Sequence, residues 1–173
     1  MYNFKIQQVN INDILKLQEI GITTFSETFS ASNTAENMAE YLKKGFSIEK
    51  LTEELANNHS QFFFALYDGR LIGYLKLNFG ASQTELKDSK ALEIERIYVL
   101  NEFHGKKVGQ LLYQKAIEIA HQMQVNYVWL GVWEENLRAL NFYKKNGFVE
   151  FDKHLFKLGE DEQTDIMMKM ILL

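Results

Sequence analysis

The chain has 173 residues and contains neither cysteine nor proline. Without a thiol it can form no disulfide, no cysteine-ligated metal site and no cysteine acyl-enzyme. A net charge of -4 argues against a nucleic-acid binder, whose charge balance is normally basic, and mildly favours a cationic partner. Hydrophobic residues make up 46% of the chain, enough for a sizeable core, and we expect one domain over residues 1–173.

The sequence shows no sign of membrane insertion or export. Its N-terminal residues lack the apolar segment of a signal peptide, and no apolar run approaches the roughly 20 residues that span a bilayer. Repeats, low-complexity tracts and linkers are also missing. We therefore expect a cytoplasmic protein that contacts no membrane, a location with which the lack of cysteine is compatible.

The first sixty residues are predicted to form a strand followed by helices. Residues 4–9 alternate like a short strand. Asn10 and Asp13 then have the spacing of a capping box, and apolar residues recur at helical spacing beyond them. The predicted helices run from Asn10 to about Phe29, from Asn33 or Thr34 to near Gly45, and onward from a cap at Ser47.

A hairpin and a further strand are predicted next. Two aromatic-rich runs are joined by Asp68-Gly69, a strong hairpin signal because both residues tolerate positive φ. Residues 80–90 are polar and are predicted to form a loop. Strict alternation in the following strand would place Glu93, Glu95, Ile97 and Val99 on one face and Ile94, Arg96 and Tyr98 on the other.

The remainder alternates between helices and strands. We predict a helix from Val108 to about Met123, a strand over 127–132, a helix from Asn136 to Asn146 stopped by Gly147, and strands near 148–156 and 164–172. The whole order predicts an α/β protein whose mixed sheet has about seven strands with flanking helices.

A glycine-containing turn at 104–109 joins a strand to a helix. Such a turn directs unpaired backbone N–H groups at one point, with the positive end of the helix dipole behind them, and so favours phosphate. Gly105 and Gly109 would let the backbone approach the ligand, while Lys106 and Lys107 add positive charge. The turn matches neither the Walker nor the dinucleotide pattern, and alone it fits a basic helix start equally well.

A second motif strengthens the interpretation of the first. Asn136 stands near a helix start and Tyr143 follows seven residues later, about two turns on, so both can face the same side. The pair of motifs, HGKKVG and N-x-x-A-x-x-x-Y-x-x-x-G-F, resembles the coenzyme-binding core of the GNAT superfamily of acyl-CoA-dependent N-acyltransferases. SQFFF, LEIERIYV, WLGVWE, FYKKNGFV and GEDEQTD look like the PaiA-type spermidine/spermine N-acetyltransferases. The resemblance covers most of the chain and is strongest from about residue 60 onward.

This resemblance implies the GNAT fold, acetyl-CoA as co-substrate and a set of coenzyme-binding residues. His104 stands where the family usually has Gln or Arg, which loses a fixed positive charge. Lys107 replaces a glycine, placing a Cβ where the backbone normally crowds the phosphates while adding a charge. The implied coenzyme-binding residues are Ile97, Tyr98, Val99, His104, Gly105, Lys106, Lys107, Val108, Gly109, Gln110, Asn136 and Tyr143.

The resemblance also implies catalytic roles that suit amine acylation. An alkyl amine is mostly protonated at pH 7 and must lose a proton before it attacks a thioester. Glu93 and Glu95 are the candidate bases, the backbone N–H of Val99 is a candidate oxyanion donor, and Tyr143 is the candidate acid for the departing thiolate. Alternatively, the glutamates are solvated or pair with Arg96 or Lys90, and the tyrosine is a core aromatic. Because no cysteine exists, we expect direct transfer in a ternary complex.

The expected acceptor is a primary amine, in particular a polyamine such as spermidine or spermine. Acidic residues on the predicted helices are either solvated faces or a rim that attracts a polyamine: Glu36, Glu40, Glu49, Glu53 and Glu54. The alternatives are a protein amine, another small amine, or a CoA-binding regulatory protein with little catalysis. A homodimer is common among such relatives. The four histidines lack metal-ligand spacing, so no metal is expected.

Overall fold

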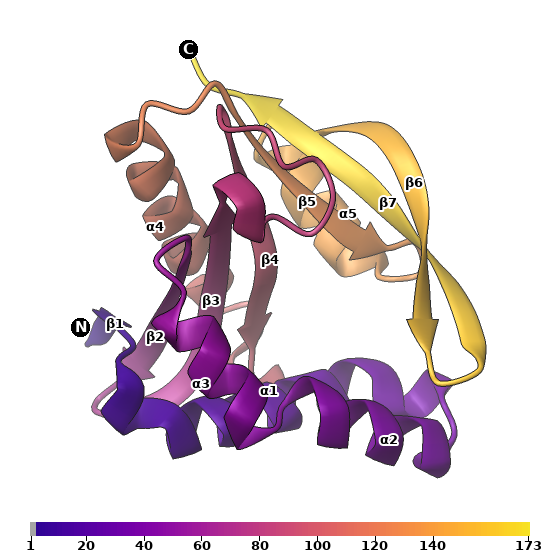
Figure 1. Cartoon of the computed structure of the whole chain (residues 1–173). Helices are drawn as coiled ribbons and strands as arrows, with labels where there is room; N and C mark the ends of the chain where they lie inside the picture. The colour runs from indigo at the N-terminus through magenta and orange to yellow at the C-terminus, as the bar shows by residue number, and fades with distance from the viewer. Residues whose placement is uncertain (1–2) are drawn as a thin grey trace.

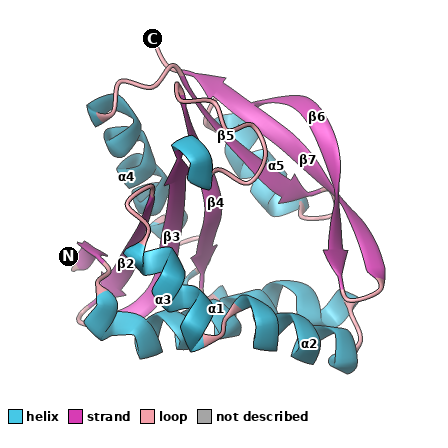
Figure 2. Cartoon of the chain, viewed as in Figure 1, coloured by secondary structure: helices cyan, strands magenta, loops and turns pink. Residues whose placement is uncertain are grey.

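The computed structural model describes residues 3–173. Seven strands form one sheet in the order β1-β2-β3-β4-β5-β7-β6, with helices on both faces (Figures 1 and 2). The strands are β1 (Phe4–Gln8), β2 (Ser60–Tyr67), β3 (Arg70–Phe79), β4 (Ala91–Val99), β5 (Tyr127–Trp133), β6 (Val149–Leu158) and β7 (Asp161–Ile171). The helices are α1 (Ile14–Phe29), α2 (Ala35–Gly45), α3 (Ile48–Ala56), α4 (Val108–Gln122) and α5 (Leu137–Lys145). The predicted α/β class and mixed sheet are confirmed.

The sheet opens between β4 and β5. These two strands are parallel and pair from Ala91 opposite Tyr127 to Glu93 opposite Trp129, where the pairing ends. Every other neighbouring pair in the described sheet is antiparallel. In Figure 1 the two strands separate toward the bottom of the view, where α1 and α2 run. The opening therefore lies beside helices that come from the N-terminal part of the chain.

Helices cover the two faces of the sheet differently. Helices α1 and α3 pack on β2, β3 and β4, while α4 packs on the other face of β1 to β5. Helix α5 adjoins α4, where the ring centroids of Phe142 and Tyr113 lie 6.1 Å apart. The main apolar core contains buried side chains from both layers, including Leu17, Leu51, Leu75, Ile94, Leu112 and Val128.

The helix starts follow the predicted caps. Asn10 and Asp13 form the reciprocal capping box, and residues 11–13 make a short 3₁₀ turn that leads into α1. Thr34 caps α2 by accepting the Asn37 N–H, and Ser47 caps α3 by accepting the Lys50 N–H, each at 3.2 Å. The three helices that follow β1 are therefore confirmed. Within residues 3–173 none of the helices has the length and apolar character needed to cross a bilayer.

The two hairpins differ in how well the sequence predicts them. Asp68 and Gly69 turn between β2 and β3 with φ values of 47° and 83°, as expected. The final hairpin is longer than predicted, because β6 continues to Leu158 and β7 already begins at Asp161. The sequence near its tip is polar, which is typical of a loop, yet Lys157, Glu160, Asp161 and Glu162 are simply exposed to solvent there. A turn at Gly159, which has φ 62°, is sufficient.

A bulge in β4 overturns the predicted alternation of its side chains. Lys76 of β3 lies opposite Arg96, but the next residue, Leu77, lies opposite Ile94, so Glu95 is one extra residue. The face predicted for residues beyond Glu95 is therefore wrong. Side chains that precede the bulge keep their predicted faces.

The bulge sorts the β4 side chains into a polar set and an apolar set. Glu93, Glu95, Arg96 and Tyr98 face α1 to α3, whereas Ile94, Ile97 and Val99 belong to the apolar side under α4. The amide of Asn78 contacts the carboxylates of both glutamates, which fixes them on one face. The bulge thus gathers charged side chains where the sheet opens.

Candidate active site

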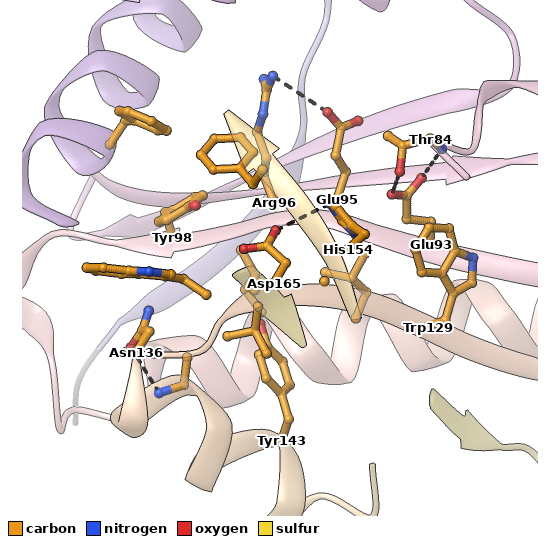
Figure 3. Close-up of a pocket in the computed structure, with 18 of the residues that line it drawn as sticks. Thr84, Glu93, Glu95, Arg96, Tyr98, Trp129, Asn136, Tyr143, His154 and Asp165 are labelled. Carbon is orange, nitrogen blue, oxygen red and sulfur yellow. Dashed lines mark hydrogen bonds and ion pairs between the residues drawn. The ribbon is translucent and has the colours of Figure 1, made fainter. Parts of the chain in front are cut away.

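A cavity of about 310 Å³ occupies the opening between β4 and β5. Aromatic side chains of α1 and α2 form one wall, and α5 forms another. The hairpin β6-β7 and the loop before β4 close the far side (Figure 3). The cavity therefore collects side chains from segments that are far apart in the sequence.

The structure brings six of the predicted site residues together at this cavity. They are Glu93, Glu95, Ile97, Tyr98, Asn136 and Tyr143. Val99 and the turn at 104–110 are not among the lining residues of the described chain; they lie where β4 leads into α4. The predicted acid and both predicted bases thus share one cavity, and the predicted phosphate turn lies beyond its edge.

Tyr143 is both a core residue and a cavity residue. Its side chain is 5% exposed, and its ring packs against Phe142 and Phe148 at 5.4 and 5.5 Å. Burial raises the pKa of its hydroxyl well above the usual range. The hydroxyl therefore stays protonated at neutral pH and has a proton to donate, but it is a weaker acid than an exposed tyrosine.

Asn136 begins α5, as its spacing predicts. Its Oδ1 accepts the backbone N–H of Ala139 at 3.2 Å, which caps the helix (Figure 3). The capping bond uses the side-chain oxygen and leaves the amide NH₂ group, which can only donate. Asn136 can therefore cap α5 and donate a hydrogen bond to a ligand in the cavity at the same time.

Glu95 belongs to a buried ion-pair cluster. Its carboxylate lies 2.6 Å from Lys76 Nζ and 3.6 Å from the Arg96 guanidinium. Glu54 of α3 completes the cluster at 3.2 Å from Lys76 and 3.7 Å from Arg96, so its predicted place on a solvated helix face is wrong. Burial alone would raise the pKa of Glu95, but Arg96 and Lys76 lower it to about 2. Glu95 is therefore held ionised.

Glu93 has a different environment. It is 3% exposed, and burial raises its pKa although three hydrogen bonds oppose that shift. The backbone N–H and the hydroxyl of Thr84 donate to it at 2.8 and 2.5 Å, and Asn78 donates at 3.0 Å. Glu93 thus fastens the loop that precedes β4 to the sheet.

The loop before β4 is ordered by further buried contacts. Trp129 Nε1 donates to Gln83 Oε1 at 2.7 Å, and Gln83 Nε2 donates to the carbonyl of Asp88 at 2.8 Å. Trp129 is therefore a buried residue at the edge of the cavity. The other tryptophan, Trp133, lines the cavity and meets Phe29 at 5.5 Å.

Three cavity residues were missed by the sequence interpretation. His154 of β6 lies between two carboxylates, with Nδ1 3.1 Å from Glu85 Oε1 and Nε2 3.8 Å from Asp165 Oδ2. Burial raises the pKa of Asp165, and His154 partly opposes this shift. The GEDEQTD motif ends at Asp165, which was the available signal. In the described chain no cluster of three such side chains has the arrangement of metal ligands.

The glycine turn has a strained residue at its centre. Lys107 adopts the left-handed conformation, φ 64°, at the position that precedes α4, where glycine would be free of strain. A Cβ added at Gly105 or Gly109 would meet nothing within 4 Å, so the space beside the turn is open. Lys106 Nζ lies 4.6 Å over the ring of Phe103. The turn is therefore shaped for a close-lying ligand, and Lys107 is its exceptional residue.

His104 turns its ring back toward β4. Its Nε2 lies 2.7 Å from the carbonyl oxygen of Val99, and because a carbonyl only accepts, this nitrogen carries the proton. Burial lowers the pKa of His104, and the nearby charge of Arg138 lowers it further. The imidazole is therefore neutral at pH 7. The charge of Arg138 also acts on Tyr143, where it lowers a pKa that burial raises.

The sequence and the fold are similar to those of known proteins. The model of the acetyltransferase (GNAT) family matches residues 23–148, more than half of the chain, and the chain belongs to this family. It is 40% identical over 172 residues to an uncharacterised N-acetyltransferase of Lactobacillus delbrueckii subsp. lactis, covering 99% of each chain. It is also 27% identical over 171 residues to a spermidine N(1)-acetyltransferase of Thermoplasma acidophilum, covering 96% of each.

One solved structure with a similar fold contains coenzyme A. The PaiA N-acetyltransferase of Thermoplasma acidophilum in complex with coenzyme A superposes with a TM-score of 0.81 at 25% identity, over 98% of this chain and 99% of that one. The predicted family and GNAT fold are confirmed. The chain is an acetyl-CoA-dependent N-acetyltransferase of GNAT type.

Proposed function

We propose that the enzyme transfers the acetyl group of acetyl-CoA to a primary amine of a small polyamine such as spermidine or spermine. The observation that carries this proposal is the chemistry of the cavity wall. Four carboxylates line it, those of Glu85, Glu93, Glu95 and Asp165. Glu95 is paired with Lys76, and Glu93 is hydrogen-bonded to Thr84 of the loop before β4. The remaining two, Glu85 and Asp165, share His154 as their neighbour. Negative charge in a confined cavity attracts a cationic substrate.

The aromatic side of the cavity suits an alkylammonium chain. Phe29 meets Trp133 at 5.5 Å and Phe156 at 6.3 Å, and Tyr41 meets Phe156 at 5.8 Å. Aromatic faces attract ammonium groups and also pack against the methylene segments between them. The similarity to a spermidine N(1)-acetyltransferase supports the same acceptor class.

The proposed mechanism is direct attack in a ternary complex. The amine loses its proton to a group of the cavity, attacks the thioester carbon, and forms an oxyanion that the Val99 N–H stabilises. Tyr143 then protonates the departing thiolate. Glu93 and Glu95 stay predictions for the base, and their environments differ: Glu95 is ion-paired with a pKa of about 2, whereas the pKa of Glu93 is raised.

The coenzyme contacts are also proposals. The turn from His104 to Gly109, with the N–H of Gln110, would hold the pyrophosphate, while Ile97, Tyr98, Val99 and Asn136 would hold the pantetheine arm. Because His104 is neutral, we add Arg138 to this set as a source of positive charge. The side chain of Gln110 donates to Asn146 at 3.0 Å, so its backbone is the part left for the coenzyme.

Release of free thiol tests the proposal directly. The purified protein is incubated with acetyl-CoA and a panel containing spermidine, spermine, a simple monoamine, an aminoglycoside and a lysine peptide. Since the protein has no cysteine, every thiol that appears comes from the coenzyme. We expect the polyamines to have the highest kcat/KM. Transfer only to the other amines would remove the polyamine from the proposal and keep the amine acetyltransferase.

One observation favours a second candidate function. Lys107 is strained at the centre of the phosphate turn, which a CoA-binding regulatory protein would tolerate more easily than an efficient enzyme. Tight CoA binding without turnover on the whole panel would support that function. The homodimer and the cytoplasmic location stay predictions, to be checked by light scattering and by cell fractionation.

A further inference from the structure

We propose that Asp165 is a further catalytic residue, which takes the proton from the acceptor ammonium group and passes it to His154. This inference rests on the proposed function, since it concerns how the acceptor amine becomes a nucleophile. It gives a role to Asp165, the last residue of the GEDEQTD motif. Glu93 and Glu95 lie outside that motif.

The position of Asp165 in the cavity supports this role. It lies on β7 opposite Trp133, its side chain is 17% exposed, and its Oδ2 lies 3.8 Å from His154 Nε2. Gly131 of β5 leaves room beside it: a Cβ there would be 3.5 Å from both Asp165 Oδ2 and His154 Cε1. In Figure 3 Asp165 lies between Tyr143 and the side chains of Glu95 and Arg96. The carboxylate therefore faces the space where an acceptor must meet the acid.

Glu85 lies beside His154 Nδ1 at 3.1 Å, and the other two carboxylates of the cavity, Glu93 and Glu95, are engaged by several donors. Glu93 accepts three hydrogen bonds, and Glu95 is bound to Lys76 and Asn78, each at 2.6 Å. Within residues 3–173 the side-chain carboxylate of Asp165 accepts no hydrogen bond, and an ionisable neighbour, His154 Nε2, lies 3.8 Å from it. A base must have a free lone pair within reach of the proton that it removes. Among Glu93, Glu95 and Asp165, the last meets that requirement.

The electrostatic surroundings of Asp165 agree with the geometry. Burial raises its pKa, His154 of β6 lowers it, and Glu85 of the loop before β4 raises it again. Tyr41 of α2 lines the same cavity; burial raises the pKa of its phenol, and the charge of Asp165 adds to that shift. A carboxylate with a raised pKa is a stronger base than an exposed aspartate.

The proton can leave by a short route. An N–H bond of the ammonium group breaks and an O–H bond forms on Asp165, leaving on nitrogen the electron pair that attacks the thioester carbon. The proton then moves from Asp165 to His154 Nε2, directly as the site tightens or through one water. The resulting imidazolium is stabilised by Glu85 at 3.1 Å from Nδ1 and, with its side chain 27% exposed, returns the proton to solvent.

The pH dependence of an Asp165→Asn variant tests this proposal. We compare kcat/KM with spermidine from pH 6.5 to 9.5 in the wild-type enzyme and the variant. Without its base, the variant can use only the fraction of the amine that is already neutral. Below the amine pKa this neutral fraction rises about tenfold per pH unit. We expect a loss of about 100-fold at pH 7 that shrinks to less than about 5-fold at pH 9.5. A loss that stays constant with pH, or no loss, would overturn the proposal.

Two controls make the result specific. Asp161→Asn, at the exposed start of the same strand, should leave kcat/KM unchanged at every pH. His154→Gln should give a smaller loss of kcat/KM with the same pH trend. If Asp165→Asn shows no thermal shift with CoA and is therefore unfolded, His154→Gln takes its place in the test. A wild-type enzyme that acetylates no amine would overturn the proposed function and this inference together. An active wild type with an unaffected Asp165→Asn variant would overturn this inference alone.

Discussion

The carboxylate of Glu93 accepts both the backbone N–H and the hydroxyl of Thr84, at 2.8 and 2.5 Å. This relationship connects the middle of β4 to the loop at 80–90. That loop also carries Glu85, whose carboxylate lies 3.1 Å from His154. Glu93, which the sequence predicts as a base, therefore also anchors the loop that carries Glu85 at the cavity wall.

Disturbing either side of this anchor should weaken acceptor binding. We expect Glu93→Gln and Thr84→Val each to raise the KM for the amine several-fold, because the loop that carries Glu85 loses its attachment, while the KM for acetyl-CoA stays unchanged. The double variant should be no worse than the more affected single variant, since both remove the same contact. Steady-state kinetics with each substrate varied in turn measures this.

A different result would assign Glu93 the role that the sequence predicts. In that case Glu93→Gln alone would lower kcat by about 100-fold or more and remove the acidic limb of its pH profile. Thr84→Val would then keep the kcat of the wild type.

Replacing Tyr143 by phenylalanine should affect chemistry and spare binding. Its hydroxyl is protonated at neutral pH, since burial raises its pKa, and Tyr143→Phe removes the proton that would go to the departing thiolate. We expect kcat to fall by about 100-fold, while the Kd for CoA, measured by calorimetry, changes less than about twofold. Tyr113→Phe is the matched control, because Tyr113 lies on α4 and its hydroxyl bonds to the Asn146 carbonyl at 3.4 Å. Unchanged turnover in Tyr143→Phe would exclude the acid role.

Removing the charge of Glu95 should destabilise the fold. Glu95→Gln leaves buried Lys76 and Arg96 with Glu54 as their remaining partner, and breaking such a cluster costs about 3 kcal/mol. Urea unfolding at pH 7 measures the loss. Glu40→Gln, which removes an exposed pair with Lys44 at 2.7 Å, is the control and should leave the midpoint of urea unfolding nearly unchanged.

Acid should reproduce the effect of the Glu95 substitution. The pKa of Glu95 is about 2 in the folded protein, below the ordinary value of about 4.3 in an unfolded chain. Its stabilising contribution is therefore complete above pH 4.3 and is lost as the pH falls toward 2. The difference in unfolding free energy between the wild type and Glu95→Gln should shrink across this window. An unchanged difference would contradict the low pKa.

Two substitutions of Lys107 separate the effect of its backbone strain from the effect of its positive charge. Lys107→Gly relieves the left-handed conformation and should raise the unfolding free energy by about 1 kcal/mol, whereas Lys107→Ala keeps the strain. Both variants lose the positive charge. If the Cβ crowds the phosphates, the glycine variant will bind CoA more tightly than the alanine variant. Equal affinities, both weaker than wild type, would show that the charge alone matters.

The sequence predicted the framework of this protein from local signals. Caps at Asn10, Thr34 and Ser47 fixed helix starts, and Asp68-Gly69 fixed a hairpin, because each signal depends on neighbours within a few residues. Asn136 and Tyr143 were placed for the same reason, since one helix holds both on one side of the cavity.

The arrangement of charges was not accessible in the same way. The bulge at Glu95 depends on the pairing of β4 with β3, and it reverses the face of every later residue. The neighbours of His154 come from a loop about seventy residues earlier and from the next strand, and no local pattern joins Glu85 to Asp165. Distant segments that converge on one cavity have to be seen in three dimensions.

The short ladder between β4 and β5 has a consequence for the coenzyme. Beyond Glu93 and Trp129 the two halves of the sheet no longer share main-chain bonds, so the last described pair marks the point at which they part. An extended pantetheine arm lying in that opening would serve as a temporary strand between them. The enzyme would then complete its own sheet with its substrate.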